Sequence, residues 1–160
     1  MNELVIPIGL PGSGKSTYVD TNFKETHTIL CLDDIRLAMG HVFKLGSEPY
    51  AKATLETIGT ACMIRWVNII LYSTNVSKFI TKRWIDKAHD YNYTVKLIVI
   101  MTPIKVCMKR QTKNVPEEKM KMFNDQLVQL ILDIENLGAD EIIRLEDGVK
   151  WDWRAGFKIL

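Results

Sequence analysis

The stretch that most constrains the fold of this chain runs from Gly9 to Ser16 and reads Gly-Leu-Pro-Gly-Ser-Gly-Lys-Ser. It fits the phosphate-binding loop pattern G-x-x-x-x-G-K-[ST]. The apolar run 4–8 precedes the loop, and a helix-forming segment that starts at Lys15 follows it. In this strand–loop–helix context, backbone N–H groups of the loop and of the helix N-terminus point toward phosphate oxygens. The sequence therefore predicts a nucleoside triphosphate site.

Two residues of the loop carry specific expectations. Lys15 is expected to reach the β- and γ-phosphates, and the Ser16 hydroxyl is expected to hold Mg²⁺. The residues predicted to bind ATP, or another nucleoside triphosphate, are Gly9, Pro11, Gly12, Ser13, Gly14, Lys15, Ser16 and Thr17.

The length of 160 residues is typical of a single domain, which we assign to 1–160. The net charge of +2 provides no global field for nucleic acid, so any such binding has to be local. Three widely spaced cysteines lack zinc-site spacing and are interpreted as reduced core residues. We see no secretory signal or membrane span, and we expect a cytoplasmic protein, in the host cytoplasm if the source is a phage.

Apolar runs alternate with helical patterns along the chain. Strands are predicted at 4–8, 28–32, 67–72, 94–100 and 141–145, and helices at 15–22, 35–41, 48–65, 77–90, 104–112 and 116–137. Strands this rich in Val, Ile and Leu are typical of a parallel sheet buried on both faces. The predicted fold is α/β: a three-layer P-loop kinase fold with about five parallel strands and a helical lid. The aromatic tail 150–160 is expected to pack against the sheet edge or to contact a partner.

In an open parallel sheet, ligands bind at the carboxyl ends of the strands. The second predicted strand is followed there by Asp33-Asp34-Ile35-Arg36. One interpretation is structural, with an aspartate capping the next helix and Arg36 as a solvated charge. The alternative is functional: a cation in a first helical turn opposes the helix dipole unless an anion such as a phosphate lies nearby.

The third predicted strand is followed by Ser73-Thr74-Asn75, which has no carboxylate at the position where many P-loop ATPases carry a metal-binding aspartate. Motor or switch behaviour driven by hydrolysis is therefore not favoured. Thr74 and Asn75 either cap the next helix or contribute to the acceptor site.

A basic segment follows the fourth predicted strand, at about 105–121. A solvated helix face is one interpretation, and a lid that closes over the nucleotide is the other. Val115-Pro116 would separate two lid helices. Arg110 is the best candidate for transition-state stabilisation, because its planar fork can hold two oxygens of the transferring group. The predicted lid residues are Lys109, Arg110 and Lys113.

Together these elements resemble the kinase domain of phage-type polynucleotide 5′-hydroxyl kinases. The resemblance rests on Gly9 to Thr17, Asp33-Asp34-Ile35-Arg36, Ser73-Thr74-Asn75, Trp84 with Tyr91 to Val95, and the lid stretch Lys109-Arg110 with Val115-Pro116. It covers about residues 4–130.

The resemblance implies a mechanism. Asp33 corresponds to the general base that accepts the proton of a 5′-hydroxyl as it attacks the γ-phosphorus of ATP. Arg36 corresponds to the residue that contacts the phosphate on the 3′ side of the acceptor nucleotide, and Arg110 to the first lid arginine. The residues expected to bind the acceptor are Arg36, Asp34, Thr74 and Asn75.

Three features depart from the family. Ser73 stands where the family has aspartate, and the lid is shorter, with Lys113 in place of a second arginine. The phosphatase motif Asp-x-Asp-Gly-Thr is absent from the sequence, so the resemblance is to the kinase part alone.

Three functions are compatible with these residues. The first is an ATP-dependent kinase, with Asp33, Lys15 and Arg110 as catalytic residues, acting on a polynucleotide 5′-hydroxyl of DNA or RNA. The second is the same chemistry on a small acceptor such as a nucleoside or nucleotide, which the low net charge favours. The third is a non-catalytic nucleotide-binding module.

Overall fold

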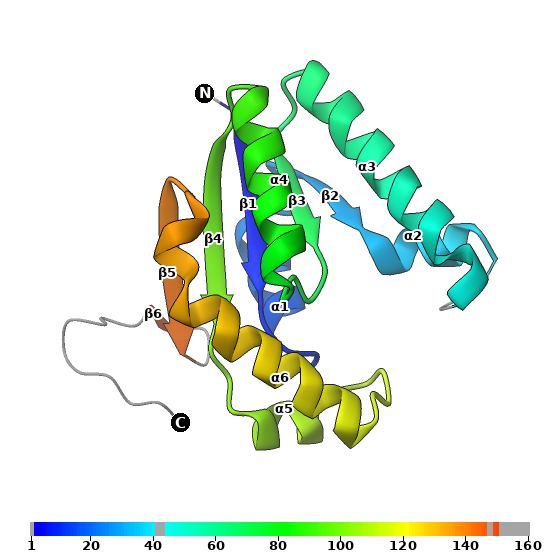
Figure 1. Ribbon diagram of the computed structural model, residues 1–160, viewed down its shortest axis with the longest axis vertical. Helices are drawn as coiled ribbons and strands as arrows, with labels where there is room; N and C mark the ends of the chain where they lie inside the picture. Colours follow the sequence, from blue (N-terminus) through cyan, green and yellow to red (C-terminus); the bar gives the residue numbers. More distant parts are fainter. Residues whose placement is uncertain (1, 41–43, 147–148, 151–160) are drawn as a thin grey trace.

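The computed structural model describes residues 2–40, 44–146 and 149–150. Its central sheet has five parallel strands in the order β2-β3-β1-β4-β5, with a short antiparallel strand, β6, added beside β5 (Figure 1). The strands are β1 (Glu3–Ile8), β2 (Thr28–Cys31), β3 (Ile69–Tyr72), β4 (Thr94–Ile100), β5 (Glu141–Glu146) and β6 (Val149–Lys150). The predicted five-stranded parallel sheet is confirmed, and β6 is an addition to it.

Helices cover both faces of the sheet, which gives three layers. Side chains alternate along each strand, so that Leu4 and Ile6 of β1 face one layer and Val5 faces the other. The larger core forms where helices α3, α4 and α6 pack on the first face, and the smaller core forms under α1 on the second. Figure 1 looks onto the face that α4 covers, with α1 behind the sheet. The predicted three-layer α/β fold is confirmed.

The helices are α1 (Lys15–Asn22), α2 (Leu32–Ala38), α3 (Glu48–Ile64), α4 (Lys78–Asp90), α5 (Ile104–Arg110) and α6 (Glu117–Leu132), with 3₁₀ turns η1 (Leu45–Ser47) and η2 (Ile134–Leu137). Most lie within a few residues of their predicted ranges. Within the described residues, no helix is both long and apolar enough to cross a membrane.

Two helices differ from the prediction in ways that matter. Helix α2 begins at Leu32, directly after β2, so Asp33 and Asp34 lie in its first turn rather than before it, and neither caps it. Arg36 lies in the last turn of this short helix, where a cation suits the helix dipole. Helix α6 ends at Leu132, and Gly138, at φ 84°, closes the 3₁₀ turn that follows. The expectations for the tail beyond Lys150 fall outside the described residues.

Candidate active site

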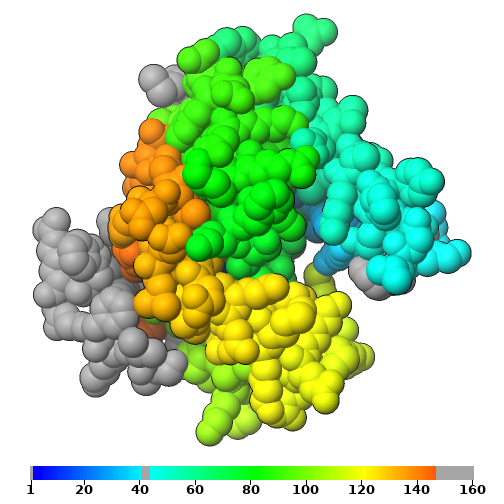
Figure 2. Space-filling view, in the orientation of Figure 1, coloured from blue at the N-terminus to red at the C-terminus, as the bar shows by residue number. Residues whose placement is uncertain are grey.

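A pocket of about 770 Å³ opens at the carboxyl edge of the sheet, between the phosphate-binding loop, helix α2 and the segment after β4. In the space-filling view, helix α6 and the α2–α3 region border a recess (Figure 2). The loop and α1 contribute Pro11, Gly12, Gly14, Lys15, Ser16 and Thr17 to the lining. The predicted nucleotide loop therefore faces a cavity that the predicted lid also lines.

The backbone of the loop requires glycine at two positions. Gly12 and Gly14 have φ angles of 81° and 98°, which side-chain-bearing residues rarely adopt. A Cβ on Gly12 would also come within 2.5 Å of the carbonyl oxygen of Cys107, so the loop packs directly on α5. The Thr102 hydroxyl donates to the Ser13 carbonyl at 2.8 Å and ties the loop to the end of β4. The phosphate-binding loop is thus held in place by its contacts with α5 and with Thr102, which follows β4.

Lys15 is folded back into this loop. Its side chain is buried, and its Nζ donates to the carbonyl oxygens of Gly9 at 2.6 Å and Leu10 at 2.8 Å. Burial lowers the pKa of Lys15 to about 7. A phosphate would supply the anion that such a buried ammonium group requires.

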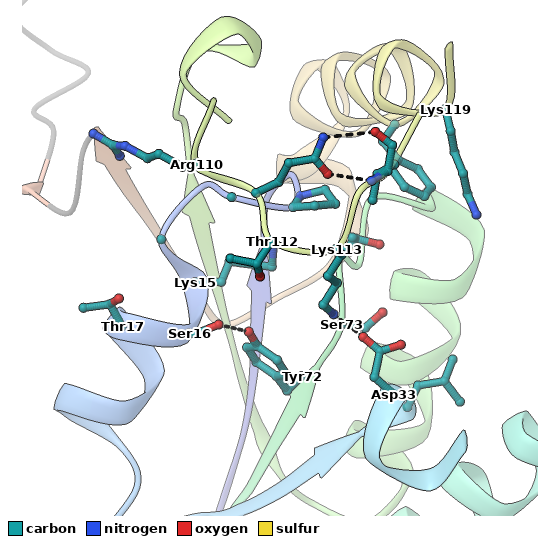
Figure 3. Close-up of a pocket in the computed structure, with 18 of the residues that line it drawn as sticks. Lys15, Ser16, Thr17, Asp33, Tyr72, Ser73, Arg110, Thr112, Lys113 and Lys119 are labelled. Atoms are coloured by element: carbon teal, nitrogen blue, oxygen red, sulfur yellow. Dashed lines mark hydrogen bonds and ion pairs between the residues drawn. The ribbon is translucent and has the colours of Figure 1, made fainter. Parts of the chain in front are cut away.

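Ser16 is paired with a pocket residue that no sequence motif indicated. Its hydroxyl makes a hydrogen bond with the hydroxyl of Tyr72, the last residue of β3 (Figure 3). Both side chains line the pocket, with Thr17 and Ser73 nearby. Oxygen donors of this kind match the preference of Mg²⁺, and Ser16 is the residue that would hold it. Among the described residues, no three His, Cys, Asp or Glu side chains come together as metal ligands would.

Asp33 lies on the opposite side of the pocket from the loop, within a network of charges. Nη1 of Arg36 donates to Oδ1 of Asp33 at 2.6 Å, and Lys113 pairs with the other carboxylate oxygen. Partial burial alone would raise the pKa of Asp33, but the hydrogen bonds and charges of Lys113 and Arg36 outweigh it and hold that pKa below its ordinary value. Asp33 is therefore an ionised carboxylate, paired with both of these cations.

Arg36 is held by a second carboxylate, that of Glu48 at the start of α3. Its Nε and Nη2 donate to the two oxygens of Glu48 at 2.6 and 2.8 Å, a bidentate arrangement. Glu48 is 8% exposed, and the hydrogen bonds from Arg36 hold its pKa below the ordinary value. The carboxylates of Glu48 and Asp33 thus already provide Arg36 with anionic partners.

The predicted lid residues lie at different places. Lys113 reaches Asp33, whereas Arg110 lines the far side of the pocket, and in Figure 3 its guanidinium extends away from Asp33. The turn between them is fixed by Gln111, whose side-chain amide donates to the Val115 carbonyl at 3.0 Å and accepts from its N–H at 2.8 Å. Lys109 does not belong to the described pocket lining.

The expected acceptor residues also separate. Arg36 and Thr74 line the pocket, but Asp34 and Asn75 do not belong to its described lining. The Asn75 side chain is buried and donates to the carbonyl oxygens of Pro7 and Leu71, at 2.8 and 2.7 Å, where it joins β1 to β3. The hydroxyl of Ser77, not Thr74 or Asn75, caps helix α4.

Comparisons with solved structures show where this fold occurs. A chain of the Pnkp1/Rnl/Hen1 RNA repair complex matches with a TM-score of 0.73 at 22% identity, over 82% of this chain and 46% of that one. The PezAT toxin–antitoxin system of Streptococcus pneumoniae matches with a TM-score of 0.71 at 16% identity, over 99% and 74%. The AvrRxo1-ORF1:-ORF2 complex with ATP matches with a TM-score of 0.70 at 10% identity, over 97% and 61%. The chain thus spans less than half the length of the RNA repair protein chain it matches.

No curated protein matches this chain. A family model described as an AAA domain matches residues 4–130, which include the loop, Asp33, Arg36 and the whole of the predicted lid. With its strand order and its phosphate-binding loop, the chain has a kinase-like P-loop fold and belongs to this AAA domain family.

Proposed function

We propose that this protein is an ATP-dependent phosphotransferase that moves the γ-phosphate to a 5′-hydroxyl of a polynucleotide. The observation that carries the proposal is the placement of the Asp33 carboxylate in the same pocket as Lys15 and Ser16. A carboxylate opposite a phosphate-binding loop can orient and deprotonate a hydroxyl nucleophile, which is what phosphoryl transfer to an alcohol requires. The fold shared with a chain of an RNA repair complex favours the same acceptor class.

The proposed roles follow the two sides of the pocket. Lys15 and the loop N–H groups bind the β- and γ-phosphates, and Ser16 holds Mg²⁺, which offsets phosphate charge when bound. Asp33 accepts the proton of the attacking hydroxyl, while Arg36 contacts the acceptor. Arg110 and Lys113 bring positive charge to the transferring phosphoryl group from the lid. The planar guanidinium of Arg110 can contact two oxygens at once, whereas the ammonium of Lys113 acts as a point charge.

A small acceptor is the second candidate, and one observation favours it. The charge of Arg36 is already offset by Glu48 and Asp33, which weakens its attraction for a further phosphate. A nucleoside or nucleotide would place less demand on that arginine than a polynucleotide does.

The experiment is transfer of labelled γ-phosphate from ATP with Mg²⁺ to a 5′-hydroxyl oligonucleotide and to a panel of nucleosides and nucleotides. Label on the oligonucleotide is the expected result. Asp33→Asn should bind ATP normally but slow transfer by roughly 10²–10⁴-fold, the usual contribution of a general base. Asp20→Asn removes an exposed carboxylate from α1 and is the matched control.

Each other outcome has a distinct meaning. Label on a small acceptor alone would support the second candidate, a kinase of nucleosides or nucleotides, in place of the first. ATP binding without transfer to any acceptor would favour the non-catalytic module. Near-normal transfer by Asp33→Asn would remove Asp33 from the role of base.

A further inference from the structure

Tyr72 lines this pocket although no sequence motif indicated it. It is the last residue of β3, and side-chain alternation places it on the same face as Ile70, the face that α1 covers. Helix α1 begins with Lys15 and Ser16, so the end of β3 and the start of α1 meet there. The Tyr72 ring packs against the smaller core, which restricts its motion.

The contact that results is specific. The Tyr72 hydroxyl is hydrogen-bonded to Oγ of Ser16, and both line the pocket (Figure 3). A serine hydroxyl that binds a cation offers the metal a lone pair, and its proton then needs another acceptor. In P-loop NTPases, Mg²⁺ is held jointly by the loop Ser or Thr and an aspartate at this edge of the sheet. Here the oxygen beside Ser16 is a phenol.

We propose that Tyr72 is a positioning residue: its hydroxyl oxygen accepts a hydrogen bond from the Ser16 hydroxyl and so fixes the orientation in which Ser16 receives the Mg²⁺ that accompanies ATP. This inference rests on the proposed nucleotide and metal binding of the site. It does not depend on the identity of the acceptor. Its consequence is that the Tyr72 hydroxyl contributes to the metal-dependent part of ATP affinity and not to the metal-free part.

The test is a comparison of ATP affinities by calorimetry, with Mg²⁺ and with EDTA, for the wild type and for Tyr72→Phe. The ratio of the two affinities measures how strongly the metal assists binding. Loss of one hydrogen bond that orients a metal ligand should lower this ratio by about tenfold. The affinity in EDTA should remain within about twofold, since the ring and its packing are kept.

A double-mutant cycle provides a second readout. In Ser16→Ala the hydroxyl that Tyr72 orients is gone, so adding Tyr72→Phe should change the ratio little further. Mn²⁺ bound with ATP, followed by electron paramagnetic resonance, should show the same non-additivity. Tyr18→Phe is the matched control, because Tyr18 lies on α1 and packs against the same core as Tyr72 but does not line the pocket.

The outcomes separate this inference from the proposed function. A Tyr72→Phe protein that keeps the wild-type ratio overturns the inference, as does an equal loss of affinity with and without Mg²⁺, which would indicate a packing role. Additive effects of the two substitutions also overturn it. If the wild type shows metal-assisted ATP binding and the expected Tyr72→Phe effect but transfers no phosphate, the inference stands and the proposed function fails.

Discussion

The ammonium group of Lys15 lies inside the phosphate-binding loop, where it is expected to bind the phosphates of a nucleotide. It donates to the carbonyl oxygens of Gly9 and Leu10, and burial lowers its pKa to about 7. A bound phosphate favours the charged form and raises that pKa. At pH values between the pKa of Lys15 without ATP and its pKa with ATP bound, binding must therefore be accompanied by uptake of a proton.

This linkage predicts the pH dependence of ATP affinity. As pH rises from about 7.5 to 9, where the terminal phosphate is already ionised, the affinity should fall by up to roughly tenfold per pH unit. Calorimetry in two buffers of different ionisation enthalpy should detect proton uptake. Lys15→Met has no titrating group at this position and should bind more weakly, without the uptake. A flat affinity with no buffer-dependent heat would contradict the prediction.

At the scale of elements, local sequence signals located the loop and most of the strands but not the start of α2. The pair Asp33-Asp34 is typical of a helix cap, yet the chain turns from β2 into the helix without an intervening loop, and Cys31 holds the cap position. The acidic pair then lies in the first turn, where the helix dipole favours it. Asp33 and Arg36 therefore line the pocket from within the helix and not from a loop that precedes it.

The partners of these residues were beyond sequence reasoning because they are distant along the chain. Glu48 meets Arg36 from the start of α3, and Tyr72 meets Ser16 from the end of β3. Only the sheet order and the packing of the helices bring such pairs together. Their residue types carried no motif of their own, so pattern analysis gave no signal for them.

Glu48 links two elements, and its charge has a predictable effect on catalysis. It fixes the Arg36 guanidinium from α3 and offsets part of its charge, and Arg36 in turn pairs with Asp33. Glu48→Gln keeps the shape but removes the charge. We expect the rate of transfer at saturating substrates to fall by roughly 10–100-fold, since small displacements at a reacting centre cost that much. The KM for ATP should change little, because Glu48 is not among the residues described as lining the pocket and its partner Arg36 lies outside the phosphate-binding loop.

A matched control exists on the same helix. Glu56 of α3 also pairs with two cations, Arg83 and Lys87 of α4, but these do not belong to the described pocket lining, whereas Arg36, the partner of Glu48, does. Glu56→Gln should leave the rate near the wild-type value. An equal loss in both variants would indicate that α3 acts only through stability, and a fully active Glu48→Gln would contradict the positioning of Arg36.

At the scale of the whole molecule, charge is nearly balanced, and the question is where the cations gather. The net charge is only +2, yet Arg36, Arg110, Lys113 and Lys119 all line one pocket. Arg36 is partly offset by Asp33 and Glu48, and Lys113 is partly offset by Asp33. Acceptor binding therefore depends on a local field, which salt can measure.

A polynucleotide acceptor releases counterions when its phosphates bind, and a neutral nucleoside does not. If two or three phosphates of a single strand are engaged, the acceptor affinity should fall with salt with a log–log slope of about −1.4 to −2.1. The measurement is the acceptor KM across a salt series at fixed, saturating ATP and Mg²⁺. Lys119→Met should make the slope shallower by about 0.7 if that lysine meets a phosphate. A slope near zero for the best acceptor would mean that this pocket does not bind the acceptor's phosphates. The small-acceptor proposal would then replace the polynucleotide one.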